Sequence, residues 1–394
     1  MTSVLKSLSL SAYRGISGLV LDELTPVSLV VGPNNSGKSS ILEAAGLLLR
    51  PPDPVQWVSA VRQRDVDGLL VDGLLSLFPT ARAGDVGDGD GRGSGSGAGF
   101  DDGTGDGRGF GSGAGFGDGT REGEDAGPFE GAGQERGLGL DRRTRAIELS
   151  CKFSNGSRAL MARPSVSWRV TEAGVAEATT SIDVNVDGAA PILLRIPGPV
   201  PSHQVLVYRV YTVTPATHYS TRVLVEHLSH VAADGKKQLA VELLRLFDPN
   251  VQDLDVVAFN SGLDSVRVTH RVRGVVDLAS FGDGMRRAAA LALALTRASH
   301  GVVLVDELEA GIHPSALRQV LSYLLEAAAT SQVQILATTH SLEAVDAVLA
   351  AVEERGTPDT LSAFWVKRRD AGHESRRYDA GRLRRMREGG FDVR

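Results

Sequence analysis

Cysteine, long apolar runs and a secretory leader are scarce or missing in this sequence, and each absence excludes a class of protein. The one cysteine, Cys151, cannot form an intramolecular disulfide. No apolar run approaches the roughly 18 residues that a membrane-spanning helix requires. Residues 1–6 lack the basic and then apolar layout of a secretory signal. We therefore expect a cytoplasmic protein without a membrane partner, and its 394 residues suffice for one large or two ordinary domains.

Residues 84–139 differ in composition from the rest of the chain. They hold 23 of the 46 glycines, and 12 Asp and Glu against 4 Arg, within a chain whose net charge is -6. Two near-duplicate decapeptides start 16 residues apart, which does not match the period of about nine residues in calcium-binding repeats. Because few aliphatic side chains are available for burial, the segment cannot offset its ordering entropy. We expect a disordered Gly/Asp-rich insertion without a calcium site.

Hydrophobic periodicity predicts an α/β core interrupted by other elements. Strand patterns occur at residues 5–13, 27–31, 302–305 and 333–338 and, as an antiparallel series, across 146–213; helical spacing occurs at residues 39–49, 221–247, 286–295 and 314–330. The alternation after residue 286 indicates a mostly parallel sheet. We expect residues 1–50 and 275–394 to form the two halves of the core. Residues 146–274 are then an inserted β-strand arm and helical subdomain.

Residues 32–39, Gly-Pro-Asn-Asn-Ser-Gly-Lys-Ser, match the P-loop pattern and stand between a predicted strand and helix. Glycines let backbone N–H groups curl around phosphates, and the helix N-terminus adds its positive end. We expect Lys38 to reach the β and γ phosphates and Ser39 to ligate Mg²⁺. The predicted nucleotide-contacting residues of this segment are Gly32, Pro33, Asn34, Asn35, Ser36, Gly37, Lys38, Ser39 and Ser40. Residues 250–253 do not match the guanine-reading motif, so we expect ATP rather than GTP.

An apolar strand pattern at residues 302–305 ends in Asp306 and Glu307, which is typical of a Walker B element. Asp306 would hold Mg²⁺ through water, and Glu307 would polarise the attacking water. Two solvated acids at the end of a strand are the plain alternative. The complete P-loop upstream favours the catalytic interpretation.

Two further segments complete the predicted site. A Ser- and Gly-rich turn, with Ser280, Gly282 and Gly284, precedes the helix before Walker B; such a turn caps the γ-phosphate bound by the opposite subunit in ABC-type ATPases. His340 follows the next buried strand, where a switch histidine contacts the γ-phosphate. A structural turn and a structural histidine are the alternatives. The order of the motifs favours the functional roles, with Lys38, Glu307 and His340 as the catalytic residues.

With these motifs in order, the chain resembles the OLD/RecF-like branch of the ABC ATPases, which includes compact bacterial ATPases found with phage-defence nucleases. Residues 12–16 and 306–314 add to the resemblance. It implies a P-loop NTPase fold of the ABC/SMC-like head type with a mixed sheet. It also implies a homodimer that uses ATP and Mg²⁺, with Arg14 near the phosphates or base, or else at the surface. Residues 311–314 would touch the other subunit.

The same resemblance implies a nucleotide-driven switch in antiviral defence or DNA repair, with a separate nuclease or other effector and DNA as candidate partners. The 54 residues after His340 are too few for the nuclease domain of the OLD proteins. The Q-loop glutamine stays open between Gln56, Gln134 and Gln204. The alternatives are an ABC transporter ATPase subunit, whose signature normally reads Leu-Ser-Gly-Gly-Gln, and a nucleotide-dependent DNA-binding scaffold with little hydrolysis.

Three other patterns receive weaker interpretations. Residues 183–188 begin like an EF-hand loop, but Leu194 stands where that loop needs Glu, so we expect a strand. Asp253 and Asp255 are interpreted as solvated loop residues. Residues 367–394, with 10 Lys and Arg against 5 Asp and Glu, form either a phosphate-contacting face or a solvated helix surface.

Overall fold

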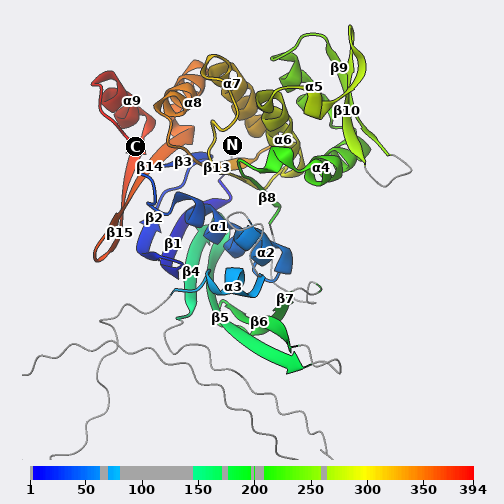
Figure 1. Cartoon of the computed structure of the whole chain (residues 1–394). Coiled ribbons are helices and arrows are strands. Elements are labelled where there is room, and N and C mark those ends of the chain that lie inside the picture. Colours follow the sequence, from blue (N-terminus) through cyan, green and yellow to red (C-terminus); the bar gives the residue numbers. More distant parts are fainter. Residues whose placement is uncertain are drawn as a thin grey trace, which may run out of the picture. The chain divides into compact units, whose positions relative to one another are not determined.

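Strands from both ends of the chain meet in one six-stranded sheet in the computed structural model (Figure 1). The order is β15 (Gly372–Asp379), β14 (Leu361–Arg369), β3 (Val27–Val31), β13 (Gln334–Thr338), β12 (Val302–Val305) and β8 (Val210–Val213). All neighbours in this core sheet are parallel except β14 and β15, which are antiparallel. The carboxyl ends of the parallel strands therefore meet at one edge, where ligands bind in open α/β sheets.

The structure describes residues 3–62, 70–79, 145–170, 176–196, 199, 208–258 and 264–394, all within one compact unit. The insertion expected at residues 84–139 lies outside these ranges, as do the candidate Q-loop residues Gln134 and Gln204. Within the described ranges, no helix combines the length and the apolar character that crossing a membrane requires.

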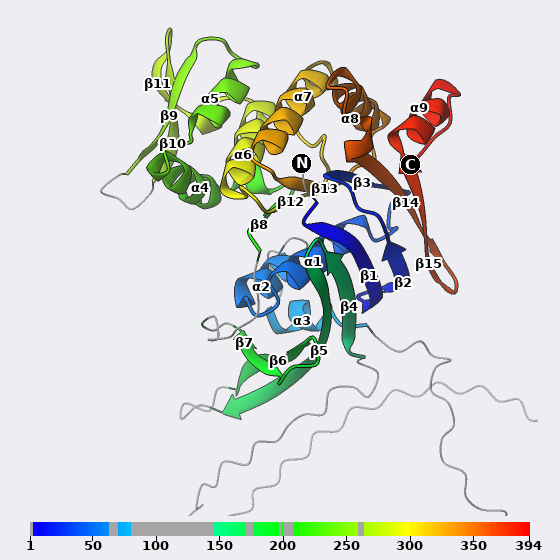
Figure 2. The ribbon, with the colours of Figure 1, turned by 180° about the vertical axis from the view of Figure 1, so that it is seen from behind.

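Alternating side chains of the core sheet serve two separate hydrophobic clusters. On β3, Val27, Leu29 and Val31 belong to one cluster and Val30 to the other. The first cluster is covered by α6 (Asp283–Arg297), α7 (Pro314–Thr330) and α8 (Leu342–Glu354), and the second by α1 (Lys38–Leu49) (Figures 1 and 2). The P-loop helix and the helix of the predicted signature thus cover opposite faces.

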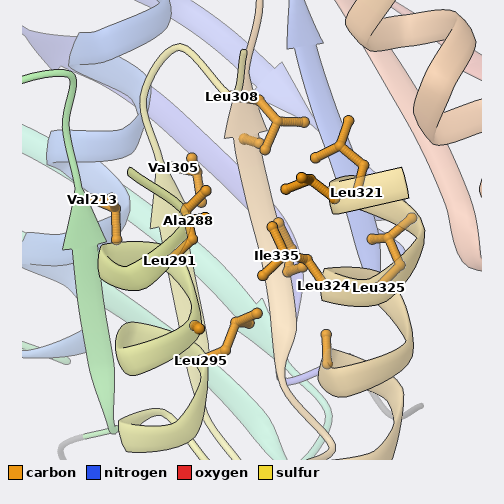
Figure 3. Close-up of a cluster of buried hydrophobic side chains, with 14 of the residues drawn as sticks. Val213, Ala288, Leu291, Leu295, Val305, Leu308, Leu321, Leu324, Leu325 and Ile335 are labelled. Atoms are coloured by element: carbon orange, nitrogen blue, oxygen red, sulfur yellow. The ribbon is translucent and has the colours of Figure 1, made fainter. Parts of the chain in front are cut away.

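Leucines from two helices fill the first cluster. Leu291 of α6 and Leu321 of α7 point toward Val305 and Ile335 on the sheet (Figure 3). All four side chains are at most 6% exposed. Because complete burial of such a side chain contributes about 1.5–3 kcal/mol, this layer is a large source of stability for the strands that carry the site.

A second six-stranded sheet, entirely antiparallel, packs in the cluster that contains α1. Its order is β2 (Ile16–Leu21), β1 (Leu5–Tyr13), β4 (Ile147–Phe153), β5 (Gly156–Val170), β6 (Ala176–Val186) and β7 (Ile192–Ile196), and α2 (Pro54–Arg62) and α3 (Leu70–Leu75) lie in the same cluster. Leu10 of β1 pairs with Leu149 of β4, so segments before and after the insertion share this sheet.

The two sheets are joined by the side chain of Gln334, which is 1% exposed on β13. Its Oε1 accepts the N–H of Leu5 at 2.7 Å, and its Nε2 donates to the carbonyl of Leu5 at 2.8 Å and to that of Thr25 at 3.0 Å. The amide thus pairs with both backbone groups of Leu5, as the backbone of a neighbouring strand would.

The helical subdomain comprises α4 (Thr221–Ala233) and α5 (Gln238–Arg245) with a three-stranded antiparallel sheet. That sheet has the order β11 (Gly274–Asp277), β10 (Ser265–His270) and β9 (Val251–Val257). Short 3₁₀ turns, Thr217–Tyr219 and Leu278–Ser280, connect the subdomain to the core. At the C-terminus, α9 (Ala380–Glu388) follows β15.

Two sequence-based expectations are corrected here. The stretch from residue 146 to 274 does not lie wholly outside the core, because β8 extends the core sheet as the parallel neighbour of β12. Asp253 and Asp255 lie on β9 rather than in a loop, and both carboxylates bind the ammonium of Lys237, at 2.8 and 2.7 Å. Both features depend on long-range pairing, which local periodicity does not reveal.

Candidate nucleotide-binding site

The P-loop connects the carboxyl end of β3 to the first turn of α1. Gly32 has a φ of 151°, and a Cβ there would lie 2.2 Å from the carbonyl oxygen of Val366 on β14. Gly37, the N-cap of α1, has a φ of 88°. Since these conformations favour glycine, both residues are needed for the tight course of the loop. Such a loop presents backbone N–H groups to an anion.

Two polar side chains occupy this loop. The Lys38 ammonium donates to the carbonyls of Gly32 at 2.8 Å and Pro33 at 3.0 Å, so its charge is held inside the turn. Burial lowers the pKa of Lys38, and nearby carboxylates, Asp306 first among them, oppose that shift. The hydroxyl of Ser36, a residue 2% exposed, has no hydrogen-bond partner within the described ranges. The buried Ser36 hydroxyl and the Lys38 ammonium lie in the same loop, and this combination fits an anionic ligand such as a phosphate.

Asp306 is the point where the two halves of the core meet. Its Oδ1 accepts hydrogen bonds from the hydroxyls of Ser39, at 3.1 Å, and Thr338, at 2.5 Å. Among the described residues, no cluster of three or more His, Cys, Asp or Glu could hold a metal ion. The donor set nevertheless fits Mg²⁺, which commonly uses one or two protein oxygens with phosphate and water oxygens.

Glu307 has an unusual backbone conformation for a non-glycine residue. Its φ is 50°, which lies in the left-handed region and costs of order 1–3 kcal/mol. Its N–H donates to the hydroxyl of Thr338 at 2.9 Å, and its carbonyl accepts from Arg287 at 3.0 Å. These two bonds keep the strained residue at the end of β12.

Arg287 of α6 received no individual role from the sequence, although its side chain joins three segments of the site. It is 0% exposed and donates to the backbone carbonyls of Thr214, Asp306 and Glu307. Burial lowers the pKa of Arg287 to about 10, and the carboxylate of Asp306 opposes that shift, so the group remains charged near neutral pH. The sequence signal that could have identified Arg287 is an arginine that precedes the alanines of an apolar helix face.

His340 lies beside a carboxylate that the sequence analysis also missed. Its backbone N–H donates to Oε1 of Glu309 at 3.2 Å, and its Nδ1 lies 3.4 Å from the same oxygen. The other oxygen of Glu309 accepts the hydroxyl of Thr339 at 2.7 Å. Ser341 then caps α8 by accepting the N–H of Ala344. Glu309 thereby holds the segment that carries His340.

The predicted signature residues lie at the N-terminus of α6. The hydroxyl of Ser280 donates to the carbonyl of Asp277 at 2.6 Å, and Gly282 is the N-cap of the helix. A Cβ on Gly284 would lie 3.0 Å from the carbonyl oxygen of Gly311. The first turn of α6 therefore packs against Gly311 and Ile312, which begin the segment that the resemblance assigns to a subunit contact.

Comparison with known proteins shows similarity over the second half of the chain. Residues 216–346 match the family described as "AAA domain, putative AbiEii toxin, Type IV TA system". A protein of Methanocaldococcus jannaschii, Uncharacterized protein MJECL11, is 32% identical over 114 residues, which are 29% of this chain and 98% of that protein. The chain belongs to the same family as this Methanocaldococcus jannaschii protein, and its residues 216–346 match the AAA-domain family.

Other similarities are more distant. The "ATP/GTP phosphatase" of Helicobacter pylori is 24% identical over 158 residues, which span 39% of this chain and 41% of that protein. The SMC head bound to the C-winged helix domain of ScpA has a TM-score of 0.49 at 12% identity, covering 95% of this chain and 98% of that one. The SMC head domain from Thermotoga maritima has a TM-score of 0.43 at 12% identity, covering 95% and 99%.

Arg14 and Gln56 contact groups outside the P-loop. Arg14 donates to Glu43 of α1 at 2.7 Å and to the carbonyl of Ala60 at 2.9 Å. It is therefore partly buried against α1 and α2 instead of lying on the surface. Gln56 lies on α2 next to Gly46. A contact between Arg14 and the nucleotide stays a prediction.

Proposed function

We propose that this protein binds and hydrolyses ATP as a dimeric ABC-type switch. The observation that carries the proposal is the hydrogen bond from Ser39 to Asp306, since it joins the P-loop to the Walker B strand across 267 positions of sequence. The family match over residues 216–346 supports the same conclusion. Magnesium held by Ser39 and Asp306 would neutralise charge on the β and γ phosphates.

The chain's own side chains supply the remaining elements of a phosphoryl-transfer site. Lys38 provides a positive charge inside the loop, and Glu307 would accept a proton from an attacking water. His340, held by Glu309, provides a donor at the end of β13, where the γ-phosphate would lie. No covalent intermediate is needed, because positioning and charge stabilisation supply most of the catalysis in this class.

The dimeric part of the proposal rests on the two faces of the core sheet. The P-loop helix α1 belongs to one hydrophobic cluster and the signature helix α6 to the other. The Ser280 turn of one subunit is thus suited to cap a nucleotide held by the P-loop of a second copy. Arg287 links that turn's helix to the carbonyls of Asp306 and Glu307, so closure of the dimer would bear directly on the catalytic carboxylate.

For the output of the switch, we propose control of a separate effector, with DNA as a candidate ligand, in antiviral defence or DNA repair. The OLD/RecF-like resemblance and the toxin–antitoxin wording of the matched family support a partner-dependent role. The basic C-terminal face is less available to DNA than its charge suggests. Several of its arginines are already paired, including Arg369 with Glu374, Arg384 with Glu353 and Arg387 with Asp346.

Phosphate release by purified protein with ATP and Mg²⁺ tests the proposal. We expect Lys38→Ala to lose ATP binding and Glu307→Gln to bind ATP, lose turnover and accumulate dimers. Arg318→Ala, on the exposed face of α7, is the matched control and should behave like wild type. Hydrolysis at the wild-type rate by Glu307→Gln would refute the assignment of the base. Wild-type protein that binds ATP without releasing phosphate would favour the scaffold function instead.

A further inference from the structure

The signature turn, residues 280–284, carries a negative charge at the place where the proposed dimer meets a triphosphate. Asp283 lies between Gly282 and Gly284, and its side chain is 50% exposed. The N-terminal end of a helix stabilises a carboxylate, which is the ordinary role of an acid in the first turn. A γ-phosphate held by a second copy is an anion as well, so the two charges would repel one another. Closure of the dimer therefore requires that the Asp283 carboxylate be held or offset.

Tyr219 binds this carboxylate from the segment that leads to α4. Its hydroxyl donates to Oδ2 of Asp283 at 2.7 Å. The other oxygen, Oδ1, lies 3.7 Å from Nη1 of Arg286, three residues further along α6. The hydrogen bond to Asp283 raises the pKa of Tyr219, so the hydroxyl stays protonated near neutral pH. Each oxygen of the carboxylate therefore faces a donor of its own subunit.

The ring of Tyr219 has two neighbours that restrict its rotation. The imidazole of His218 lies against it, with 4.0 Å between the ring centroids, and the guanidinium carbon of Arg286 lies 4.9 Å from the centroid of the tyrosine ring. His218 is 2% exposed, and burial, followed by the charge of Arg287, lowers the pKa of His218. The imidazole is therefore neutral near neutral pH and adds no charge to the turn. These contacts keep the 54% exposed tyrosine directed toward Asp283.

The backbone around Tyr219 is attached to the core sheet and to α4. The N–H of Tyr219 donates to the carbonyl of Ala216 at 3.1 Å, and the next residue, Ser220, caps α4. Before this turn, β8 ends at Val213 as the parallel neighbour of β12. Helix α4 packs beside α6 (Figures 1 and 2). Tyr219 thus joins the first turn of α6 to a segment that is anchored in the core sheet.

We propose that Tyr219 is a positioning residue of the signature turn, which holds the Asp283 carboxylate against the connection to α4 and away from the γ-phosphate bound by a second copy. This inference rests on the proposed function and deepens it, because it names a residue that closure of the dimer needs. The backbone N–H groups of the turn would then be left to the phosphate. Tyr219 touches no reacting atom and acts only through Asp283.

Dimerisation of the full chain with ATP and Mg²⁺, followed by analytical ultracentrifugation at pH 8 in a Glu307→Gln parent, tests this role. Tyr219→Phe removes only the hydroxyl and should weaken the dimer by about tenfold, because Asp283 is no longer held. ATP binding by the monomer should stay as in the parent. Addition of Asp283→Asn to Tyr219→Phe removes the charge and should restore dimerisation to within about twofold of the parent.

The matched control is Tyr323→Phe. The hydroxyl of Tyr323 on α7 donates to Oε2 of Glu242 at 2.8 Å, so this variant loses a hydrogen bond of the same kind outside the signature turn. It should dimerise like the parent. Thermal melts of the two Tyr→Phe variants compare the cost of the lost bond to folding, which should be similar.

Three results would overturn the assignment: a Tyr219→Phe chain that dimerises like the parent, a double variant that stays as weak as Tyr219→Phe, or an equal loss in Tyr323→Phe. The second would mean that Tyr219 only supports the fold of the turn, because removal of the charge would then bring no recovery. A Glu307→Gln parent that binds ATP but stays monomeric would refute the proposed dimer together with this inference. Failure of the inference alone is recognised by a parent that does dimerise.

Discussion

Glu309 and His340 lie on consecutive loops of the core sheet, with 3.4 Å between Oε1 and Nδ1. The side chain of Glu309 is 14% exposed, whereas that of His340 is 52% exposed. The carboxylate also accepts the backbone N–H of His340. The backbone of His340 is thus held by Glu309, whereas its imidazole ring stays accessible. This arrangement suits a side chain that contacts a ligand.

Removal of Glu309 should therefore impair turnover more than binding. We expect Glu309→Ala to lower kcat by up to about a hundredfold, because a displaced catalytic group loses alignment, with less than a threefold change in the Kd for ATP. Glu326→Ala, an exposed carboxylate on α7, is the control. Steady-state kinetics and equilibrium binding measure both quantities. A parallel loss in kcat and affinity would indicate a general structural role for Glu309.

Arg287 should matter for both stability and catalysis. Truncation to Ala leaves three buried carbonyls without their donor, so we expect a loss of about 3 kcal/mol in the free energy of unfolding. Arg287→Lys keeps the charge but lacks the fork geometry, so it should fold and still show reduced turnover. Denaturant unfolding and phosphate release test the two variants. Wild-type turnover in Arg287→Lys would contradict the link between α6 and Glu307.

Mixed dimers test whether the site is shared between subunits. A Lys38→Ala chain combined with a Ser280→Arg chain should rebuild one intact site, from Lys38 of one subunit and Ser280 of the other. ATPase activity should then exceed that of either variant alone, up to about half of wild type. Differently tagged subunits would verify that heterodimers form. Activity that stays at the level of the single variants in verified heterodimers would exclude the shared site.

We also expect that the purified protein does not cleave nucleic acid. A two-metal nuclease needs several carboxylates around ions about 4 Å apart, and Asp253 and Asp255 are instead bound to the same ammonium of Lys237. Plasmid and linear DNA incubated with protein, ATP and Mg²⁺ or Mn²⁺ should stay intact on a gel. Cleavage that co-elutes with the protein and disappears in the Asp253→Ala/Asp255→Ala double variant would overturn this prediction.

His227 should make the protein less stable in mild acid. The residue is buried on α4 with its ring against Tyr211, and burial lowers the pKa of His227 to about 4. The unfolded chain, with a histidine pKa near 6.5, binds the proton more readily, so stability falls as pH drops from 6.5 to 4. His227→Phe should lose less stability over this range in urea titrations, whereas His230→Gln, exposed on the same helix, should follow wild type. Identical pH profiles for His227→Phe and wild type would contradict the prediction.

The sequence predicted the elements that carry the site, because each has a strong local pattern. Residues 314–330 form α7 as expected, and the P-loop lies between β3 and α1. Local patterns could not reveal that Glu309 binds the loop of His340, since both side chains lie on irregular segments. The position of β8 could not be predicted either. This strand has only four residues, and its place in the sheet depends on its pairing with β12.

The same limit applies to residues that act through backbone contacts. Arg287 binds only carbonyl oxygens, and the carbonyl of Val366 lies against Gly32 because β14 pairs with β3. Neither relation depends on a recognisable spacing in the chain. Both depend on the parallel strands of the core sheet, whose carboxyl ends lie along one edge.

The amide of Gln334 has a mechanical consequence for the proposed switch. Because it engages both backbone groups of Leu5, a slide of β13 against β1 by even one residue would break two hydrogen bonds at once. Strand β13 is therefore attached to the antiparallel sheet at Gln334, four residues before its carboxyl end at Thr338. Any displacement of His340 must then arise by bending after Thr338. In the proposed switch, a force acting on a bound γ-phosphate would then bend the chain after Thr338 instead of shifting β13.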